Sequence, residues 1–205
     1  MSEKPCLNNN SIIPAIKESE KFIKFLINRF KLEVPNNYII TINKASKNTI
    51  GFFMPKEHDN HFINSTQDLM NINLNTIHLK KCCPYECLTH ELAHLINNVN
   101  KIKDCSGYGY HNKHFKTQAE KFNLSVEKGK NGFNQTKPTE EFNKMLLEFK
   151  PNKEVFNICQ NHEDKKKGSR LRLYICNCGV KVRVGSDDFN AKCLNCESEF
   201  KKVIK

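Results

Sequence analysis

The sequence predicts an α+β fold followed by a small β module that is held together by four cysteines. Three observations support this prediction: apolar residues recur at helical spacing near the N-terminus, runs rich in β-branched residues follow, and two close cysteine pairs lie near the C-terminus. A chain of 205 residues is long enough for one ordinary domain and a small second module.

The chain is predicted to begin with a disordered segment and a helix. Residues 1–13 are polar, rich in Asn and without periodicity, so we expect them to be disordered. An amphipathic helix is predicted from Pro14 to about Leu32, because Pro suits the first turn of a helix and the apolar residues that follow lie on one stripe.

A small sheet is predicted next. Residues 37–43 and 48–54 are rich in β-branched and aromatic residues and are bounded by turn formers, so we expect two strands that form a hairpin. In the segment 70–79, Ile72 and Leu74 alternate with Asn, a pattern that suits a half-buried or edge strand.

Further helices are predicted in the middle of the chain. One begins at Pro84 and ends near Asn97, another covers 111–124, and a third follows a turn and carries the apolar stripe of 142–149. The polar segment after it predicts a linker. The expected organisation is a disordered N-terminus at 1–13, a main domain at 14–125, a helical extension and linker at 126–168, and a cysteine module at 169–205.

Residues 89–98 read THELAHLINN, which places two histidines four residues apart with a glutamate beside the first. On a helix, His90 and His94 would lie on one face, so their imidazoles could bind one metal ion. Leu residues form the opposing stripe, so this face, with Cys87 and Glu91, is expected to border a cleft. The alternative is a solvated helix whose two histidines bind no metal.

A catalytic zinc has three protein ligands and a water, so a third ligand must come from another segment. We favour His111, because it lies four residues before Phe115 and shares the apolar stripe of its predicted helix, whereas His114 is turned toward solvent. The full set of candidates is His58, His61, His78, His111, His114 and His162.

The segment LTHELAHLINN, followed by KDCSGYGYHNKHFKTQAEKFNL, resembles the SprT-like family of zinc metallopeptidases, to which the DNA-protein crosslink protease Spartan belongs. The later GFNQTKPTEEF is similar to the segment after the catalytic core in bacterial and phage members, so the resemblance runs from about residue 15 to the C-terminus. It implies a zincin-like catalytic domain at 14–125, with an N-terminal helix, a small twisted sheet and the HExxH helix, and with His111 as the third zinc ligand.

The predicted site itself indicates a mechanism. The bound zinc lowers the pKa of its water and polarises a peptide carbonyl, while Glu91 acts as general base without binding the metal. An edge strand before the active helix binds substrate in such folds, and 71–75 is the candidate here, with an ordinary edge strand as the alternative. Tyr108 or Tyr110 could donate a hydrogen bond to the oxyanion, although loop tyrosines are commonly packing residues.

Two close cysteine pairs near the C-terminus predict a structural zinc site, because four thiolates form a tetrahedron around one ion. SprT-like proteins are similar in having a Cys-x-Cys ribbon at this place. We interpret Cys159 and His162, a possible rival pair, as ordinary linker residues. The predicted ligands of the structural zinc are Cys176, Cys178, Cys193 and Cys196.

The net charge of +11 fits a nucleic-acid partner, although a solvated surface in a chain crowded with Lys is the alternative. Three of the four arginines fall in the last quarter of the sequence. The two strands expected there would carry basic side chains on one face, which predicts a phosphate-binding surface. The predicted nucleic-acid contacts are Arg170, Arg172, Lys181 and Arg183.

The sequence therefore predicts a zinc endopeptidase with one catalytic and one structural Zn²⁺, acting on DNA-bound or crosslinked proteins through a ribbon that binds DNA. One alternative is a nucleic-acid-binding protein whose zincin domain cleaves nothing, and another is a regulatory metallopeptidase with one specific protein partner. No signal peptide and no stretch of about 20 apolar residues is visible, so we expect a cytoplasmic protein that does not bind membranes. We also expect a monomer.

Overall fold

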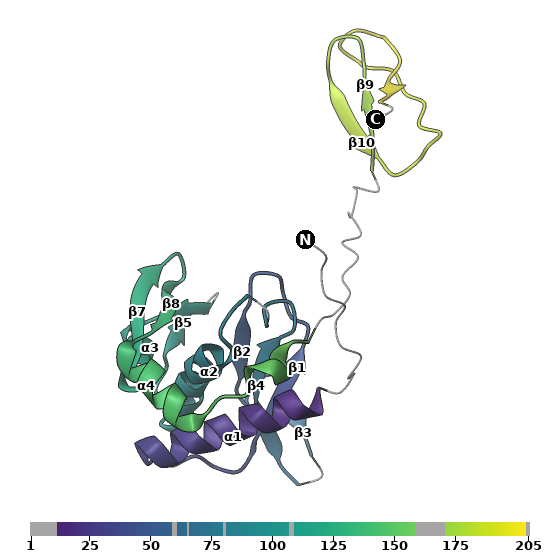
Figure 1. Ribbon diagram of the computed structural model, residues 1–205. Helices are drawn as coiled ribbons and strands as arrows, with labels where there is room; N and C mark the ends of the chain where they lie inside the picture. Colours follow the sequence, from purple (N-terminus) through teal and green to yellow (C-terminus); the bar gives the residue numbers. More distant parts are fainter. Residues whose placement is uncertain are drawn as a thin grey trace, which may run out of the picture. The chain divides into compact units, whose positions relative to one another are not determined.

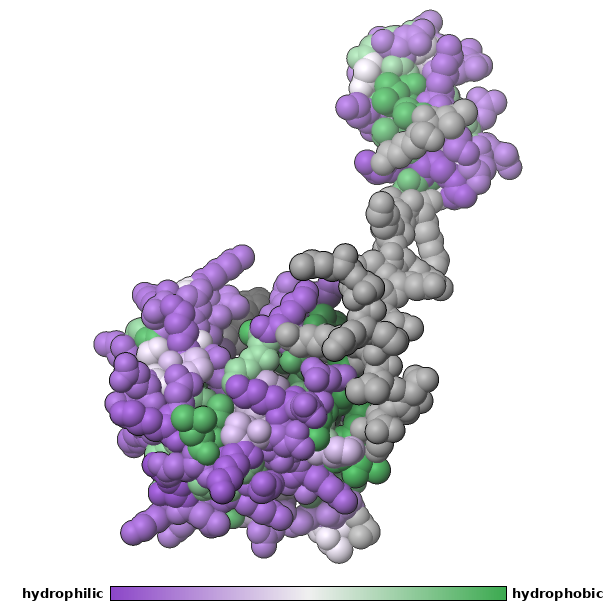
Figure 2. Space-filling model, viewed as in Figure 1, coloured by the Kyte–Doolittle hydropathy of each residue, from purple (hydrophilic) through white to green (hydrophobic). Residues whose placement is uncertain are grey.

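The computed structural model describes residues 12–58, 61–64, 66–79, 81–106, 109–158 and 171–203. These residues form four α-helices and three small sheets (Figure 1), and the chain divides into two compact units, residues 1–160 and residues 161–205. No helix in the described part of the chain is long and apolar enough to cross a membrane. The face of the first unit seen in Figure 2 is mainly hydrophilic.

The N-terminal helix α1 (Ile13–Phe30) confirms the predicted amphipathic helix. Its apolar stripe, which includes Phe22 and Leu26, is fully buried against the core. Glu18 is also buried, but its Oε1 accepts hydrogen bonds from the Tyr85 hydroxyl at 3.0 Å and from the backbone N–H of Asn152 at 2.9 Å. Helix α1 is thereby fixed to two distant parts of the chain.

The first sheet has the strand order β1-β4-β2, with the short strand β3 pairing with β4. Strand β1 runs parallel to β4 and β2 runs antiparallel to it, so β4 lies between the two strands that were expected to form a hairpin. The predicted hairpin is therefore wrong. The strands are β1 (Tyr38–Asn43), β2 (Gly51–Met54), β3 (Phe62–Ile63) and β4 (Asp68–Asn75).

The expectation of an edge strand at 71–75 is also wrong, because β4 is the central strand. Its Ile72 and Leu74 face the core, and the alternating Asn71, Asn73 and Asn75 are buried as well. Buried amides need hydrogen-bond partners. The Oδ1 of Asn73 accepts from the Thr41 hydroxyl at 2.9 Å, and the Nδ2 of Asn75 donates to backbone carbonyls of the segment before β2.

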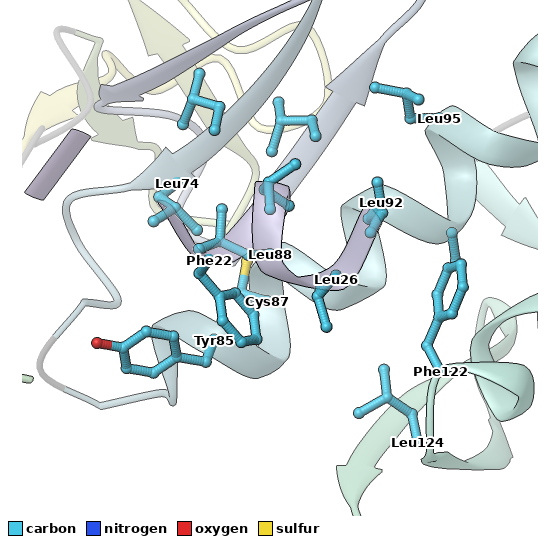
Figure 3. Packing of buried hydrophobic residues seen from close by; sticks show 14 of the residues in the cluster. Phe22, Leu26, Leu74, Tyr85, Cys87, Leu88, Leu92, Leu95, Phe122 and Leu124 are labelled. Atoms are coloured by element: carbon cyan, nitrogen blue, oxygen red, sulfur yellow. The ribbon is translucent and has the colours of Figure 1, made fainter. Parts of the chain in front are cut away.

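Helix α2 (Pro84–Val99) lies between the first sheet and the sheet that contains β8, as Figure 1 shows. Its start at Pro84 and its end agree with the prediction. The stripe of Leu88, Leu92 and Leu95 is fully buried and meets the side chains of α1 and β4 in the cluster of Figure 3. The opposite side of α2 carries the histidines.

The second sheet has the order β5-β6-β8-β7, and the β7–β8 hairpin in it was not predicted. Val126 of β7, Phe142 and Phe149 of α4 and Phe156 belong to the same core as α1 and α2, so this part of the expected extension packs into the first unit. The elements are β5 (Cys105–Ser106), β6 (Tyr110–His111), α3 (Lys113–Lys121), β7 (Leu124–Gly129), β8 (Gly132–Pro138), α4 (Glu140–Phe149) and the short 3₁₀ helix η2 (Lys153–Phe156).

The second unit contains one antiparallel sheet of order β10-β9-β11, which we call the ribbon (residues 171–203). Tyr174 is buried, and its ring meets Phe189, which in turn lies against Phe200. This core is too small to fold a module by itself, which agrees with a role for the cysteines. The strands are β9 (Arg172–Ile175), β10 (Lys181–Val184) and β11 (Lys201–Lys202).

Candidate metal centre

Three histidines from two elements converge at the surface of α2. The Nε2 atoms of His90 and His94, one helical turn apart, lie 3.2 Å and 3.1 Å from the Nε2 of His111, which belongs to β6. We call these residues the His triad. Their nitrogens form one of the groups in the described chain that could hold a metal ion.

The arrangement of the His triad fits zinc. Zinc binds imidazole nitrogen at about 2.0–2.1 Å, so two nitrogens at neighbouring corners of a tetrahedron lie about 3.3 Å apart. The two measured separations, 3.2 Å and 3.1 Å, are close to this value. Three histidines leave one corner of the tetrahedron open, as in catalytic zinc sites.

The Nδ1 of His94 is held by a carboxylate that the sequence analysis did not identify. It lies 2.8 Å from Oδ2 of Asp104, and the same oxygen accepts a hydrogen bond from the Asn97 side chain at 3.0 Å. Burial lowers the pKa of His94, but hydrogen bonds to Asp104 and Cys105 outweigh this effect and raise the value to about 10. Asp104 therefore fixes the ring with Nε2 directed at His111, as carboxylates do for zinc ligands.

The other two rings also have partners for Nδ1. The Nδ1 of His111 lies 2.9 Å from the carbonyl oxygen of Gly109, and the Nδ1 of His90 lies 3.5 Å from the Thr136 hydroxyl, which donates to Glu86 at 2.9 Å. Burial first, and then the charge of His94, lower the pKa of His111 to about 4, and burial lowers the pKa of His90 well below its usual value. These shifts favour the neutral imidazole that binds metal at His90 and His111, whereas a metal ion would have to replace the Nε2 proton of His94.

Glu91 lies beside the triad and is buried, with 4% of its surface exposed. Burial raises the pKa of its carboxyl to about 7, against the opposing effects of His94 and of a hydrogen bond from the Phe53 backbone N–H. Strand β2 passes very close to it: a Cβ at Gly51 would lie 2.5 Å from the Cys87 Sγ and 3.2 Å from Oε1 of Glu91. Only glycine permits this approach.

The triad and Glu91 line a cleft with a volume of about 1220 Å³. Strand β2 and its preceding loop form one wall, and residues 134–137 of β8 line the cleft as well. Tyr110, a candidate for stabilising the oxyanion, is not among the lining residues, and Tyr108 lies outside the described residues. The central strand β4 does not line the cleft either, whereas the edge strand β2 does.

The position of His111 differs from its prediction although the residue joins the triad. Helix α3 begins at Lys113, after Asn112 as N-cap, so His111 lies on β6 and not on the helical stripe that was used to select it. The remaining candidates do not join the group. His61 binds Asp68, His78 binds the carbonyl of Lys47, and His114 is exposed. His58 is in none of the described metal groups, and His162 lies outside the described residues.

The four cysteines of the ribbon form a second group that could hold a metal ion. The Sγ atoms of Cys176 and Cys178 lie 3.1 Å apart, and those of Cys178 and Cys193 lie 3.7 Å apart, near the value of about 3.8 Å expected for thiolates around zinc. Hydrogen bonds from Ser198 lower the pKa of Cys196 to about 6, which favours the thiolate that binds metal. Cys159 lies outside the described residues.

The basic residues of the ribbon do not share one face, which corrects the expectation for the two strands. Directly paired residues of neighbouring strands lie on the same face. Arg183 pairs with Leu173, and Lys181 and Lys201 both pair with Ile175, so these three cations share a face. Arg172 lies on the opposite face, where its guanidinium binds the carboxylate of Asp187 at 2.6 Å. Arg170 is outside the described residues.

Comparison of the chain with protein-family models, with curated proteins and with solved structures finds no match. Two groups that could hold a metal ion, the His triad and the four cysteines, are therefore the features that indicate a function.

Proposed function

We propose that this chain is a zinc-dependent endopeptidase of the SprT-like type, that it acts on DNA-associated or DNA-crosslinked proteins, and that its ribbon binds DNA. The observation that carries the peptidase proposal is the convergence of three Nε2 atoms beside Glu91 in one cleft. A site with three histidines and an open fourth corner suits a catalytic zinc, and a purely structural site would not need a carboxylate next to it.

Zinc at the triad would supply an acidified water and a Lewis acid for the peptide carbonyl. His90, His94 and His111 hold the site, and Asp104 orients one of the rings. A hydrogen bond from the Phe53 N–H holds the carboxylate of Glu91 beside the His triad. This carboxylate accepts the proton of the attacking water and delivers it to the leaving amine.

Strand β2 is the part of the cleft that can align a substrate. The carbonyl of Ile50 accepts a hydrogen bond from the Asn75 N–H, so this residue points its backbone groups at β4. The backbone N–H and C=O groups of Gly51 point away from β4, because these groups alternate between the two sides of an antiparallel strand. The edge of β2 that faces away from β4 lines the cleft, and its Phe53 N–H already binds Glu91, so an extended peptide can pair with this edge at Gly51.

The test of this proposal is a comparison of the wild type with Glu91→Gln. Both proteins are incubated with a DNA-binding protein, in the presence and in the absence of DNA, and cleavage and self-cleavage are scored. The variant should keep a zinc content of about two per chain, as the two metal-binding groups predict, and lose cleavage. Cleavage by a clean preparation of the variant contradicts the role of Glu91. Cleavage by the wild type without stimulation by DNA favours a regulatory peptidase with one protein partner.

The DNA-binding part of the proposal rests on the basic face of the ribbon, which consists of Lys181, Arg183 and Lys201. All three are exposed, and no described acidic residue forms an ion pair with them. Changing the three to Gln should weaken binding of duplex DNA and reduce its dependence on salt, since fewer counterions are released. The control is Lys144→Gln on α4, which should bind as the wild type does. Equal binding by the triple variant contradicts the assignment.

A further inference from the structure

The acidic side chains that line the cleft all have partners within the protein. The carboxylate of Glu86 accepts from the Thr136 hydroxyl, that of Asp104 binds His94 and Asn97, and Glu91 receives the Phe53 N–H. These hydrogen bonds hold the three carboxylates in place, and the charge of Asp104 is offset by its contact with His94.

The lysines that line the same cleft are differently arranged. Lys81, Lys101 and Lys103 are exposed, and none of the described carboxylates forms an ion pair with them. Lys137 is the exception, since its Nζ lies 2.9 Å from Oε1 of Glu127. Because Lys81 precedes α2 and the other two follow its end, unpaired positive charge lies at both ends of the helix that carries His90 and His94.

The backbone that carries Lys101 and Lys103, which we call the rim lysines, is fixed by hydrogen bonds. The N–H of Lys101 donates to the carbonyl of Asn98 at 2.9 Å, and the carbonyl of Lys103 accepts from the Asn112 side chain at 2.8 Å. The next residue, Asp104, is bound to His94. The rim lysines are therefore held near the His triad by the same contacts that organise the triad.

We propose that the cleft selects peptide segments with acidic side chains on both sides of the bond to be cleaved, and that Lys81 and the rim lysines determine this preference. The inference rests on the proposed peptidase function, since it names the substrate class of the same cleft. An extended peptide that pairs with β2 would extend its side chains toward the exposed lysines at each end of α2, where the charges are complementary.

A peptide fits this cleft better than a nucleic acid does. The open edge of β2 offers backbone groups that pair with another peptide backbone, and the exposed side chains of Ile50 and Ile102 give the lining an apolar part. A phosphate backbone would gain little from either feature, and at the centre of the cleft it would meet the carboxylate of Glu91.

The test measures binding and cleavage separately. In the Glu91→Gln background, fluorescence anisotropy compares two labelled peptides of the same length and core sequence, one with Asp and one with Lys on both sides of the core. An exposed ion pair contributes a factor of up to about five, so several should give a preference on the order of tenfold for the acidic peptide at low salt. Adding Lys101→Glu and Lys103→Glu should abolish the preference, whereas the control pair Lys24→Glu and Lys144→Glu on α1 and α4 should keep it.

Equal binding of the two peptides, or an unchanged preference after charge reversal of the rim lysines, overturns the proposal. It is also overturned if the reversal abolishes binding of duplex DNA and leaves the peptide preference intact, since the lysines would then serve a nucleic acid. Selective binding of the acidic peptide without its cleavage by the wild type supports the charge selectivity and contradicts only the peptidase proposal. The two ideas can thus fail independently.

Discussion

Replacing Asp104 by Asn should weaken zinc binding at the His triad without unfolding the protein. The carboxylate lies 2.8 Å from Nδ1 of His94, and the two side chains are only 13% and 10% exposed, so water cannot readily take its place. A hydrogen bond to a charged group contributes about 1.5–3 kcal/mol, and loss of the outer partner of a zinc-bound histidine typically lowers metal affinity about 10- to 100-fold. The two estimates agree, because a tenfold change corresponds to about 1.4 kcal/mol.

The assay measures competition for zinc against a chelator. The ribbon site is the same in all the proteins compared, so a difference in zinc binding reports on the His triad. Asp68→Asn is a matched control, because Asp68 also binds a histidine, His61 at 3.0 Å, but at an exposed place outside the triad. The control should bind two zinc ions as tightly as the wild type does. If Asp104→Asn keeps the wild-type affinity while its melting temperature is unchanged, the argument that this carboxylate organises the triad is refuted.

Two further substitutions test the surroundings of the two sites. Gly51→Ala places a Cβ 2.5 Å from the Cys87 Sγ and 2.8 Å from the carbonyl oxygen of Asn73, so urea unfolding should show a loss of about 1–3 kcal/mol; unchanged stability would contradict the close packing of β2 on α2. Cys193→Ser should reduce the metal content from two zincs to about one and expose the ribbon to proteolysis, while the first unit keeps its melting transition. Cys82→Ser, which changes a thiol outside both metal groups, should keep both ions, and the same loss in this control would contradict the assignment.

Helices and the cysteine group could be predicted because their signals are local. In α1 and α2 the apolar period, an initial proline and polar residues at the end lie within one segment, and the structure has both helices close to the predicted bounds. The cysteine pairs are similarly informative, since two ligands two or three residues apart are already neighbours in any compact chain. Such signals do not depend on which distant segments come together.

The order of the strands could not be predicted, because it depends on pairing between distant segments. Alternation of Asn with Ile and Leu in β4 suggested one solvated face. Those amides are instead buried, and Asn75 accepts the backbone N–H groups of Ala45 and Ile77 and donates to carbonyls before β2. The side chain of Asn75 thus satisfies backbone groups next to the sheet that pair with no strand and would otherwise bind water. An apolar-polar period cannot distinguish this role from exposure to solvent.

Only part of the site could be predicted, because the rest of it also depends on contacts between distant segments. The spacing of His90 and His94 on a helix is a local signal, but Asp104 and Thr136 act through contacts that no motif encodes. His111 was selected from a helical stripe to which it does not belong, and the resemblance that pointed to the same residue compared the order of motifs along the chain. Its place in the triad depends on β6, where His111 pairs with Cys105.

The segment between α2 and α3 explains how these separate residues reach one place. After Val99 the chain turns through Lys101, whose φ of 57° is left-handed, and returns along the end of α2. This reversal brings Asp104 to His94 and, after β5, brings His111 to the same ring. Asn112 then fixes the segment by donating its backbone N–H to the Asp104 carbonyl. Because one anchored segment supplies the carboxylate, the third histidine and the rim lysines, a substitution that loosens it should weaken metal binding and charge selectivity together.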